Sequence, residues 1–171
     1  QCRALDQLVA GSGEQPTTRS MSSLRRVNVV PRATNPLQGN RDGPGRTDLA
    51  HQVNGADVDV FQVGEGRELV LLHSLLSDRG SFEAVVPSLV QSCRLTLVDL
   101  PGFGESDRPV WLETVSDLAR FTLWLIDELN LSDVSLAGHS IGGWVAAEMA
   151  TMSPSSFEAL ILVDAAGIQP E

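Results

Sequence analysis

The sequence predicts an α/β fold in which a mostly parallel central sheet is flanked by helices. Short apolar runs, each bounded by turn-forming or polar residues, recur along residues 51–171, and such runs are typical of strands buried on both faces. Helical stretches separate them, and alternating strands and helices imply parallel strands with right-handed crossovers. Hydrophobic residues make up 42% of the 171 residues, which is enough apolar material for a packed core.

Five strands are expected from this pattern. Residues 57–63 alternate between polar and apolar side chains, as an exposed strand does. The other four strands are short apolar runs that lead into His73, Asp99, Gly138 and Asp164, namely residues 69–72, 95–98, 134–137 and 160–163.

Three helices are expected between these strands. Residues 81–92 predict a short helix that is bent or delayed at Pro87. Residues 114–130 place apolar side chains on one face, and Thr114 can cap the start of this helix. Residues 141–152 are rich in Gly, Ala and Met, a composition that suits a helix pressed closely against a sheet.

Residues 1–48 are expected to form a flexible extension, and residues 49–171 the folded part. The first fifty residues hold seven Arg and four acidic residues, with five Gly and four Pro, and residues 35–47 are the most linker-like part. Because the chain begins with Gln1, Met21 is a candidate native start. An organelle transit peptide over residues 19–32, which are rich in Arg and Ser, is the alternative interpretation.

Composition excludes several classes of protein. No apolar run approaches the roughly 18 residues of a membrane span, and a net charge of −10 argues against nucleic-acid binding. Cys2 and Cys93 cannot make a disulfide framework or a zinc site. Since no secretory pattern is present, we expect a cytoplasmic protein. The sequence does not indicate an oligomeric state.

The G-H-S-I-G-G motif, which begins at Gly138, carries the most specific chemistry. It lies between an expected strand and an expected helix, which is the context of a nucleophile elbow. Ser140 would occupy a strained turn that lifts its Oγ clear of the sheet, and Gly138 and Gly142 would avoid a collision of Cβ atoms. The N–H of Ile141 would point at a developing oxyanion. The alternative is a Gly-rich turn without catalytic function.

Two further loops follow expected strands. His73 and Ser74 come directly after residues 69–72, and the N–H of Leu75 can face the same oxyanion. We interpret His73 as a residue that holds this loop in shape rather than as a base. Asp99 begins the D-L-P-G-F-G-E-S loop, and we interpret it as an anchor of that loop.

In the order of its motifs the chain resembles the α/β-hydrolase superfamily over about residues 49–171. The resemblance implies that Ser140 is the nucleophile and that the N–H groups of Leu75 and Ile141 form the oxyanion hole. It also implies hydrolysis of a small-molecule ester or related acyl substrate through an acyl-enzyme, without a metal or organic cofactor. The motifs that carry it are H73-S74, D99-L-P-G-F-G-E-S106, G138-H-S-I-G142 and L162-V-D-A-A166.

The chain departs from the family pattern in its oxyanion loop. The family's usual Gly is Ser74 here. If that position needs a conformation that only glycine adopts, the oxyanion hole is distorted; otherwise the change is tolerated and polarises the pocket slightly.

A second departure concerns the catalytic base. The family's His follows its last strand, whereas His51 precedes the expected core, His73 lies in the oxyanion loop, and His139 is adjacent to Ser140 on a tight turn. Asp164 sits where some members keep their acid, and the alternative is an acid beyond the end of this chain. We therefore expect an N-terminal part of a serine hydrolase, truncated after about the sixth family strand and inactive or nearly so. The sheet of such a chain would end in an apolar edge. We therefore expect the chain to be either prone to aggregation or partly molten.

Other functions remain open. The same site on the same fold could cleave a carbon–carbon bond or carry out perhydrolysis. A non-catalytic relative that binds a ligand or partner is the alternative from another class, although the presence of the serine argues against it. Trp111, which follows the Asp99 loop, is a candidate for the pocket mouth, with a place in the core or rim as the alternative.

Overall fold

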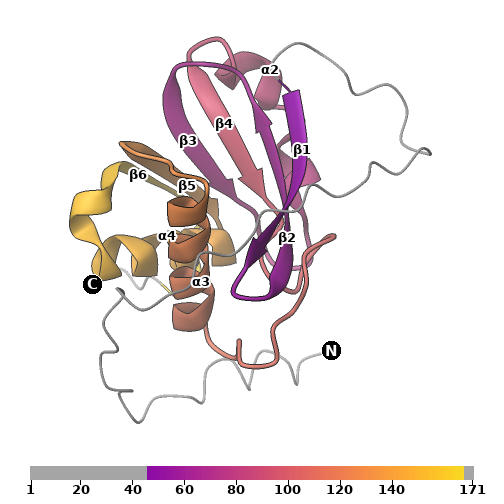
Figure 1. Cartoon of the computed structure of the whole chain (residues 1–171). Coiled ribbons are helices and arrows are strands. Elements are labelled where there is room, and N and C mark those ends of the chain that lie inside the picture. The colour runs from indigo at the N-terminus through magenta and orange to yellow at the C-terminus, as the bar shows by residue number, and fades with distance from the viewer. Residues whose placement is uncertain (1–45, 168–171) are drawn as a thin grey trace.

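The computed structural model describes residues 46–167, which form one six-stranded mixed sheet with helices on both faces (Figure 1). The strand order is β1-β2-β4-β3-β5-β6. The first two pairs in this order, β1 with β2 and β2 with β4, are antiparallel, and the remaining pairs are parallel. The strands are β1 (Arg46–Val53), β2 (Ala56–Val63), β3 (Arg67–Leu72), β4 (Cys93–Val98), β5 (Val134–His139) and β6 (Phe157–Val163).

Strand β1 was not expected from the sequence. A two-residue turn of Asn54 (φ 48°) and Gly55 (φ 82°) joins it to β2, with Val53 paired to Ala56, which is the geometry of a tight hairpin. Because β1 begins at Arg46, residues 46–48 belong to the sheet and not to the expected extension. The rest of that extension lies outside the described residues.

Two helices, α3 (Val115–Glu128) and α4 (Ile141–Met152), lie side by side and cover one face of the sheet (Figure 1). The expected helix at 141–152 is confirmed, and that at 114–130 is confirmed to within two residues. Thr114 caps α3, since its side chain accepts from the Asp117 N–H while the Asp117 carboxylate accepts from the Thr114 N–H.

Among residues 46–167, the elements on the opposite face are short helical turns. The expected helix over residues 81–92 is wrong in extent, because a 3₁₀ turn η2 (Arg79–Phe82) and a four-residue helix α2 (Val86–Leu89) stand in its place. Pro87 lies in the first turn of α2, where its missing N–H costs nothing. These turns pack on the apolar side chains of β3 and β4. A further 3₁₀ turn, η3 (Pro154–Ser156), precedes β6.

Strand β6 differs from the expectation that its apolar run is buried on both faces. It pairs with β5, yet Leu160, Ile161, Leu162 and Val163 are 39–49% exposed. Helix α4 contacts β6, yet no residue of β6 belongs to the buried core of the described residues. Strand β6 is therefore the apolar edge that a chain truncated after this strand was expected to leave.

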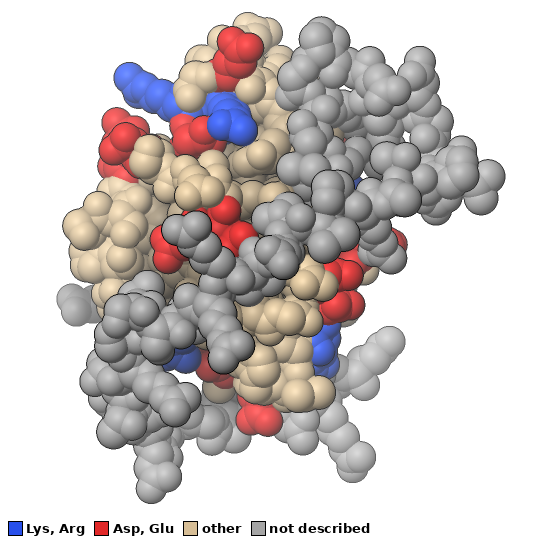
Figure 2. All heavy atoms as spheres, viewed as in Figure 1, with Lys and Arg blue, Asp and Glu red and all other residues tan. Residues whose placement is uncertain are grey.

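Acidic side chains dominate the charged surface. Figure 2 shows more red acidic groups than blue basic ones on the face in view, as expected for residues 51–171, which hold five Arg and eighteen acidic residues. None of the helices within residues 46–167 is long and apolar enough to cross a membrane.

Candidate active site

Ser140 lies between the end of β5 and the start of α4 in a strained conformation. Its φ of 54° and ψ of −115° are rare for a residue with a side chain. The Ser140 N–H donates to the Val163 carbonyl at 3.0 Å, and its carbonyl accepts from the N–H groups of Gly143 and Ala166, each at 3.0 Å. Bonds to α4, to β6 and to the segment after β6 thus hold the serine in the geometry of a strand–helix elbow.

The glycines around Ser140 are needed because other atoms come close to them. A Cβ on Gly138 would lie 2.2 Å from the Gly142 carbonyl oxygen, and a Cβ on Gly142 would lie 2.2 Å from the Leu72 carbonyl oxygen. At Gly143 it would lie 2.6 Å from the Ala165 Cβ. Each distance is shorter than van der Waals contact allows, so the turn and its packing against β3 require glycine at these positions.

The loop that follows β3 lies beside the start of α4. A Cβ on Gly142 would be only 2.5 Å from the His73 carbonyl oxygen, which places that loop against the elbow. Ile141 is the first residue of α4, where an N–H has no acceptor within the helix. Leu75 is partly buried against the core, and Leu76 has a φ of 57°. The backbone N–H groups of Ile141 and Leu75 remain the candidates for the oxyanion hole.

Ser74 does not adopt a conformation that only glycine favours. Leu76 and Ser140 are among the described non-glycine residues that have a positive φ, and Ser74 is not one of them. Ser74 therefore adopts its backbone conformation without the strain that a positive φ would cause. This geometry supports the interpretation that a serine is tolerated where the family usually has glycine.

His73 connects two loops through both of its ring nitrogens. The Leu100 N–H donates to Nε2 at 3.0 Å, so Nε2 is an acceptor and the proton belongs on Nδ1, which lies 2.8 Å from the Ser74 carbonyl oxygen. The ring is fully buried and packs edge-to-face against Phe103 at 5.4 Å. With both nitrogens engaged, this imidazole is arranged to hold the loops rather than to accept a proton from a substrate or a serine.

Asp99 organises the loop that follows β4. Its carboxylate accepts from the Arg79 N–H at 2.7 Å and from the Glu105 N–H at 3.0 Å. Its backbone carbonyl accepts from the Ser106 hydroxyl at 2.6 Å. A Cβ at Gly104 would overlap this carboxylate, at 2.0 Å from an oxygen. These bonds make Asp99 a loop anchor.

An ion pair that sequence reasoning missed lies next to Asp99. The Arg79 Nε lies 2.7 Å from the Asp59 carboxylate, and the Arg79 guanidinium stacks over the Phe61 ring at 5.6 Å. The Asp59 N–H also donates to the Ser106 hydroxyl at 2.9 Å. The pair links β2 to η2, which follows the loop that carries Leu75. No local pattern could have indicated it, because its partners stand twenty residues apart.

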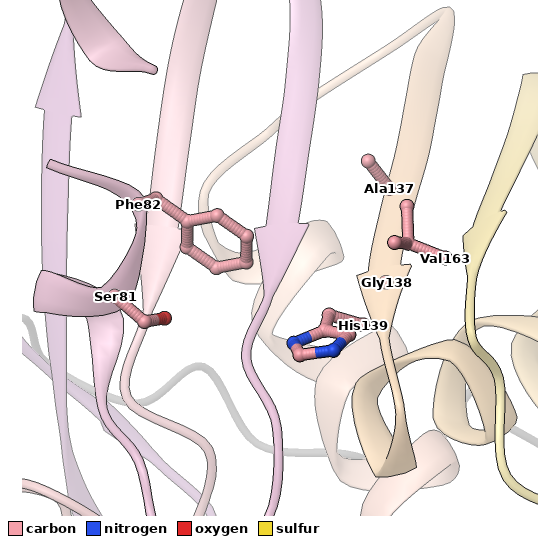
Figure 3. A pocket seen from close by; sticks show the side chains of 6 residues that line it. All are labelled: Ser81, Phe82, Ala137, Gly138, His139 and Val163. Carbon is pink, nitrogen blue, oxygen red and sulfur yellow. The ribbon is translucent and has the colours of Figure 1, made fainter. Parts of the chain in front are cut away.

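His139 faces a pocket on the side of the sheet that carries η2. The pocket has a volume of about 230 Å³ and is lined by Ser81, Phe82, Ala137, Gly138, His139 and Val163. Figure 3 shows the exposed imidazole projecting from the end of β5 toward Ser81 and Phe82. The lining is mainly apolar, so this hollow resembles an uncovered part of the sheet more than a reaction site.

Asp164 is exposed directly after β6, with a φ of 44°. None of the hydrogen bonds among residues 46–167 joins Asp164 to a histidine or the Ser140 hydroxyl to a histidine. Within the same residues, no group of three His, Cys, Asp or Glu side chains could hold a metal ion. Within the described residues the loop that begins at His73 thus lies against the elbow of Ser140, and no hydrogen bond joins Asp164 to a histidine.

Trp111 is 40% exposed and packs with Phe121 and Trp124 of α3. Its ring centroid lies 6.0 Å from that of Phe121 and 5.8 Å from that of Trp124. These contacts place Trp111 at the rim of the core on the α3 side.

Comparisons with known proteins agree with this geometry. The family described as alpha/beta hydrolase fold matches residues 68–171. A putative non-heme haloperoxidase of Mycobacterium phage D29 is 35% identical over 117 residues, which are 68% of this chain and 42% of the relative. The pimeloyl-[acyl-carrier protein] methyl ester esterase of Aeromonas hydrophila is 37% identical over 109 residues, which are 62% of this chain and 41% of the relative.

Solved structures give the same result. The structure of Cfl2 from Burkholderia cenocepacia superimposes with a TM-score of 0.69 at 30% identity, covering 77% of this chain and 49% of that one. A bacterial membrane phospholipase A superimposes with a TM-score of 0.70 at 27% identity, covering 74% of this chain and 42% of that one. The chain thus spans less than half the length of these relatives.

Proposed function

Because the chain belongs to the alpha/beta hydrolase fold family, we propose that it is part of a serine hydrolase that attacks an ester or related acyl group through Ser140. The conformation of Ser140 carries this proposal. Ser140 is held between β5 and α4 at φ 54° and ψ −115° by glycines that admit no Cβ, and backbone strain of this kind persists mainly at functional sites.

The chemistry proposed for this site is acyl transfer in two steps. The Ser140 Oγ attacks the carbonyl carbon, and a base takes the hydroxyl proton and gives it to the leaving alcohol. The N–H groups of Leu75 and Ile141 stabilise the negative oxygen of the tetrahedral intermediate, aided by the positive end of the α4 dipole. Water then attacks the acyl-enzyme, which releases the acid and restores Ser140.

We also propose that the base and its acid lie outside the described residues. His73 is engaged at both nitrogens, His51 lies in β1, and His139 projects toward η2. Asp164 is retained as a lesser candidate for the acid. Without a positioned base, Ser140 is a weak nucleophile, so the 171-residue chain should hydrolyse esters at the background rate, with no difference between the wild type and Ser140→Ala. Turnover that depends on Ser140 would overturn this part of the proposal.

The coding sequence after the codon for Glu171 provides the first test. An in-frame acidic residue and a G-x-x-H-type segment would support the hydrolase. A stop codon at that point would favour the non-catalytic relative, which binds a ligand or partner.

Activity of the protein encoded with such a continuation provides the second test. The Ser140→Ala variant should lose at least about 10³-fold in kcat/KM for a p-nitrophenyl ester. The matched control is Ser155→Ala, since Ser155 is exposed in η3, and it should leave kcat/KM unchanged. Equal activity of the wild type and Ser140→Ala would exclude Ser140 as the nucleophile.

Perhydrolysis is a second candidate, favoured by the 35% identity to a protein named as a putative haloperoxidase. In that reaction hydrogen peroxide takes the place of water in the attack on the acyl-enzyme and gives a peracid. The same continued protein, supplied with acetate and hydrogen peroxide, should then form peracetic acid, and Ser140→Ala should not. Ester hydrolysis without peracid formation would exclude perhydrolysis and support the esterase activity. Carbon–carbon bond cleavage would use the same serine, but no contact in the structure favours it.

A further inference from the structure

His51 is a buried histidine that the proposed chemistry does not use. It lies in β1 and is only 6% exposed. Neither Nδ1 nor Nε2 has a hydrogen-bond partner among the residues that the structure describes. Buried polar groups are nearly always paired, and an unpaired one calls for a physical explanation.

The imidazole lies on the side of the sheet that α3 covers. His51 pairs directly with Val58 of β2, and directly opposed residues of an antiparallel pair share a face. Val58 belongs to the core cluster that includes Leu125 and Ile126 of α3, and α3 contacts β1. His51 is therefore part of the interface between the β1–β2 hairpin and α3.

Few charges surround this imidazole. Glu128, half-buried near the C-terminal end of α3, raises the pKa of His51, but burial is the larger effect and lowers the pKa below 6.5. On β2 the opposing residue is the apolar Val58. Asp57 and Asp59 flank Val58 along the strand and therefore point to the other face.

The hairpin is also connected to the loop that Asp99 anchors. The Asp57 N–H donates to the Asp107 carboxylate at 2.9 Å, and the Asp107 N–H donates to the Asp57 carbonyl at 2.8 Å. The Asp99 N–H donates to the Asp59 carbonyl at 3.0 Å. A displacement of the hairpin would therefore disturb the loop whose other bonds lead to His73 and Arg79.

We propose that His51 is a pH-sensitive latch, so that its protonation in mild acid loosens the β1–β2 hairpin from α3. A neutral imidazole is tolerated in this apolar interface, whereas an imidazolium would be buried with Glu128 as the one compensating carboxylate among the described residues. Movement of the hairpin would strain the hydrogen bonds that Asp57 and Asp59 make with the loop of residues 99–107, and would so disturb that loop. The latch rests on the hairpin and α3, and not on the chemistry proposed for Ser140.

The direction of the pH dependence follows from linkage. The folded chain holds its proton on His51 less tightly than the unfolded chain does, so stability is fully present above the unfolded pKa and falls as the pH drops below it. The unfolding equilibrium constant should rise by up to about tenfold for each pH unit between the unfolded and folded pKa values.

The test is an NMR titration of the three histidine rings of the 171-residue chain, assigned with His51→Gln, His73→Gln and His139→Gln. The His51 ring should titrate below 6.5, and Glu128→Gln should lower its midpoint further, because the favourable carboxylate is lost. A His51 midpoint at or above 6.5 would overturn the latch. If His51→Gln does not fold, the variants of the other two histidines assign the His51 signal by elimination, and the wild type carries the measurement.

Urea unfolding, followed by tryptophan fluorescence at about pH 7.5 and about pH 5.5, gives the second readout. The wild type and the control His139→Gln should lose stability at the lower pH, and His51→Gln should lose clearly less. An equal loss in His51→Gln and in the wild type would show that other groups cause the pH dependence, and the latch would be wrong. These outcomes do not depend on esterase activity.

Discussion

Single atoms decide whether the turn at Ser140 can form. Gly142 packs against the Leu72 carbonyl oxygen, where a Cβ would lie at 2.2 Å, and because the nearest atoms are all backbone atoms of Leu72 and His73, no side chain can move aside to relieve the clash. We predict that Gly142→Ala lowers the free energy of unfolding by about 3 kcal/mol or more. Chemical denaturation of the two proteins measures the difference.

Gly55→Ala is the matched control for this prediction. Gly55 sits in the hairpin turn with a φ of 82° and no atom within 4 Å of an added Cβ. Its substitution should cost only the strain of a left-handed residue, about 1 kcal/mol. If Gly142→Ala is no more destabilising than Gly55→Ala, the close packing of α4 on β3 is not as described.

At this scale the sequence predicts contacts that are local and misses contacts that are not. The glycines beside Ser140 could be predicted, since the elbow brings residues two positions away into collision. The anchoring roles predicted for His73 and Asp99 agree with the structure, but their partners across the two loops, Leu100 and Arg79, stand 27 and 20 residues away and could not be named. The Asp59–Arg79 pair depends on how η2 docks on β2, which no local pattern records.

Helix α3 shows how one residue fixes the start of an element. Thr114 and Asp117 satisfy two backbone N–H groups reciprocally. We predict that Thr114→Ala lowers the free energy of unfolding by about 1 kcal/mol, measured by urea denaturation. In the control Thr151→Ala, an exposed hydroxyl bonds only to the Ala147 carbonyl within α4, and stability should change by less than about 0.5 kcal/mol. Equal effects of the two changes would contradict the cap.

The missed strand β1 has a physical explanation. Its inward-facing positions include His51 as well as Val53, so the apolar alternation that identifies a strand is interrupted. The Asn54–Gly55 turn was the available signal, since Asn-Gly favours the tight hairpin turns. The exposure of β6 could be predicted only from the order of the sheet, because the apolar run itself is the same as in buried strands.

The part of the molecule that the structure describes exposes an apolar strand at one edge of its sheet. Leu160, Ile161, Leu162 and Val163 are 39–49% exposed and pair only with β5 among the described strands. Such an edge offers both unpaired backbone groups and apolar surface to another chain. We predict that the chain self-associates as its concentration rises and that Ile161→Lys reduces this, as measured by size-exclusion chromatography with light scattering.

The control for this prediction is Val110→Lys. Val110 is 96% exposed but lies outside the sheet, so its substitution should leave self-association unchanged. A monodisperse wild-type monomer with a sharp cooperative melt would contradict the prediction.

We propose that the fold singles out Ser140 among the serines of the chain, and that none of the described residues supplies its base. The direct measurement is the rate at which a fluorophosphonate labels each serine, followed by peptide mass spectrometry with and without added imidazole. Imidazole can act as the general base, so labelling should be confined to Ser140, rise with imidazole and vanish in Ser140→Ala. If imidazole accelerates labelling of exposed serines such as Ser155 as much as that of Ser140, the claim is wrong.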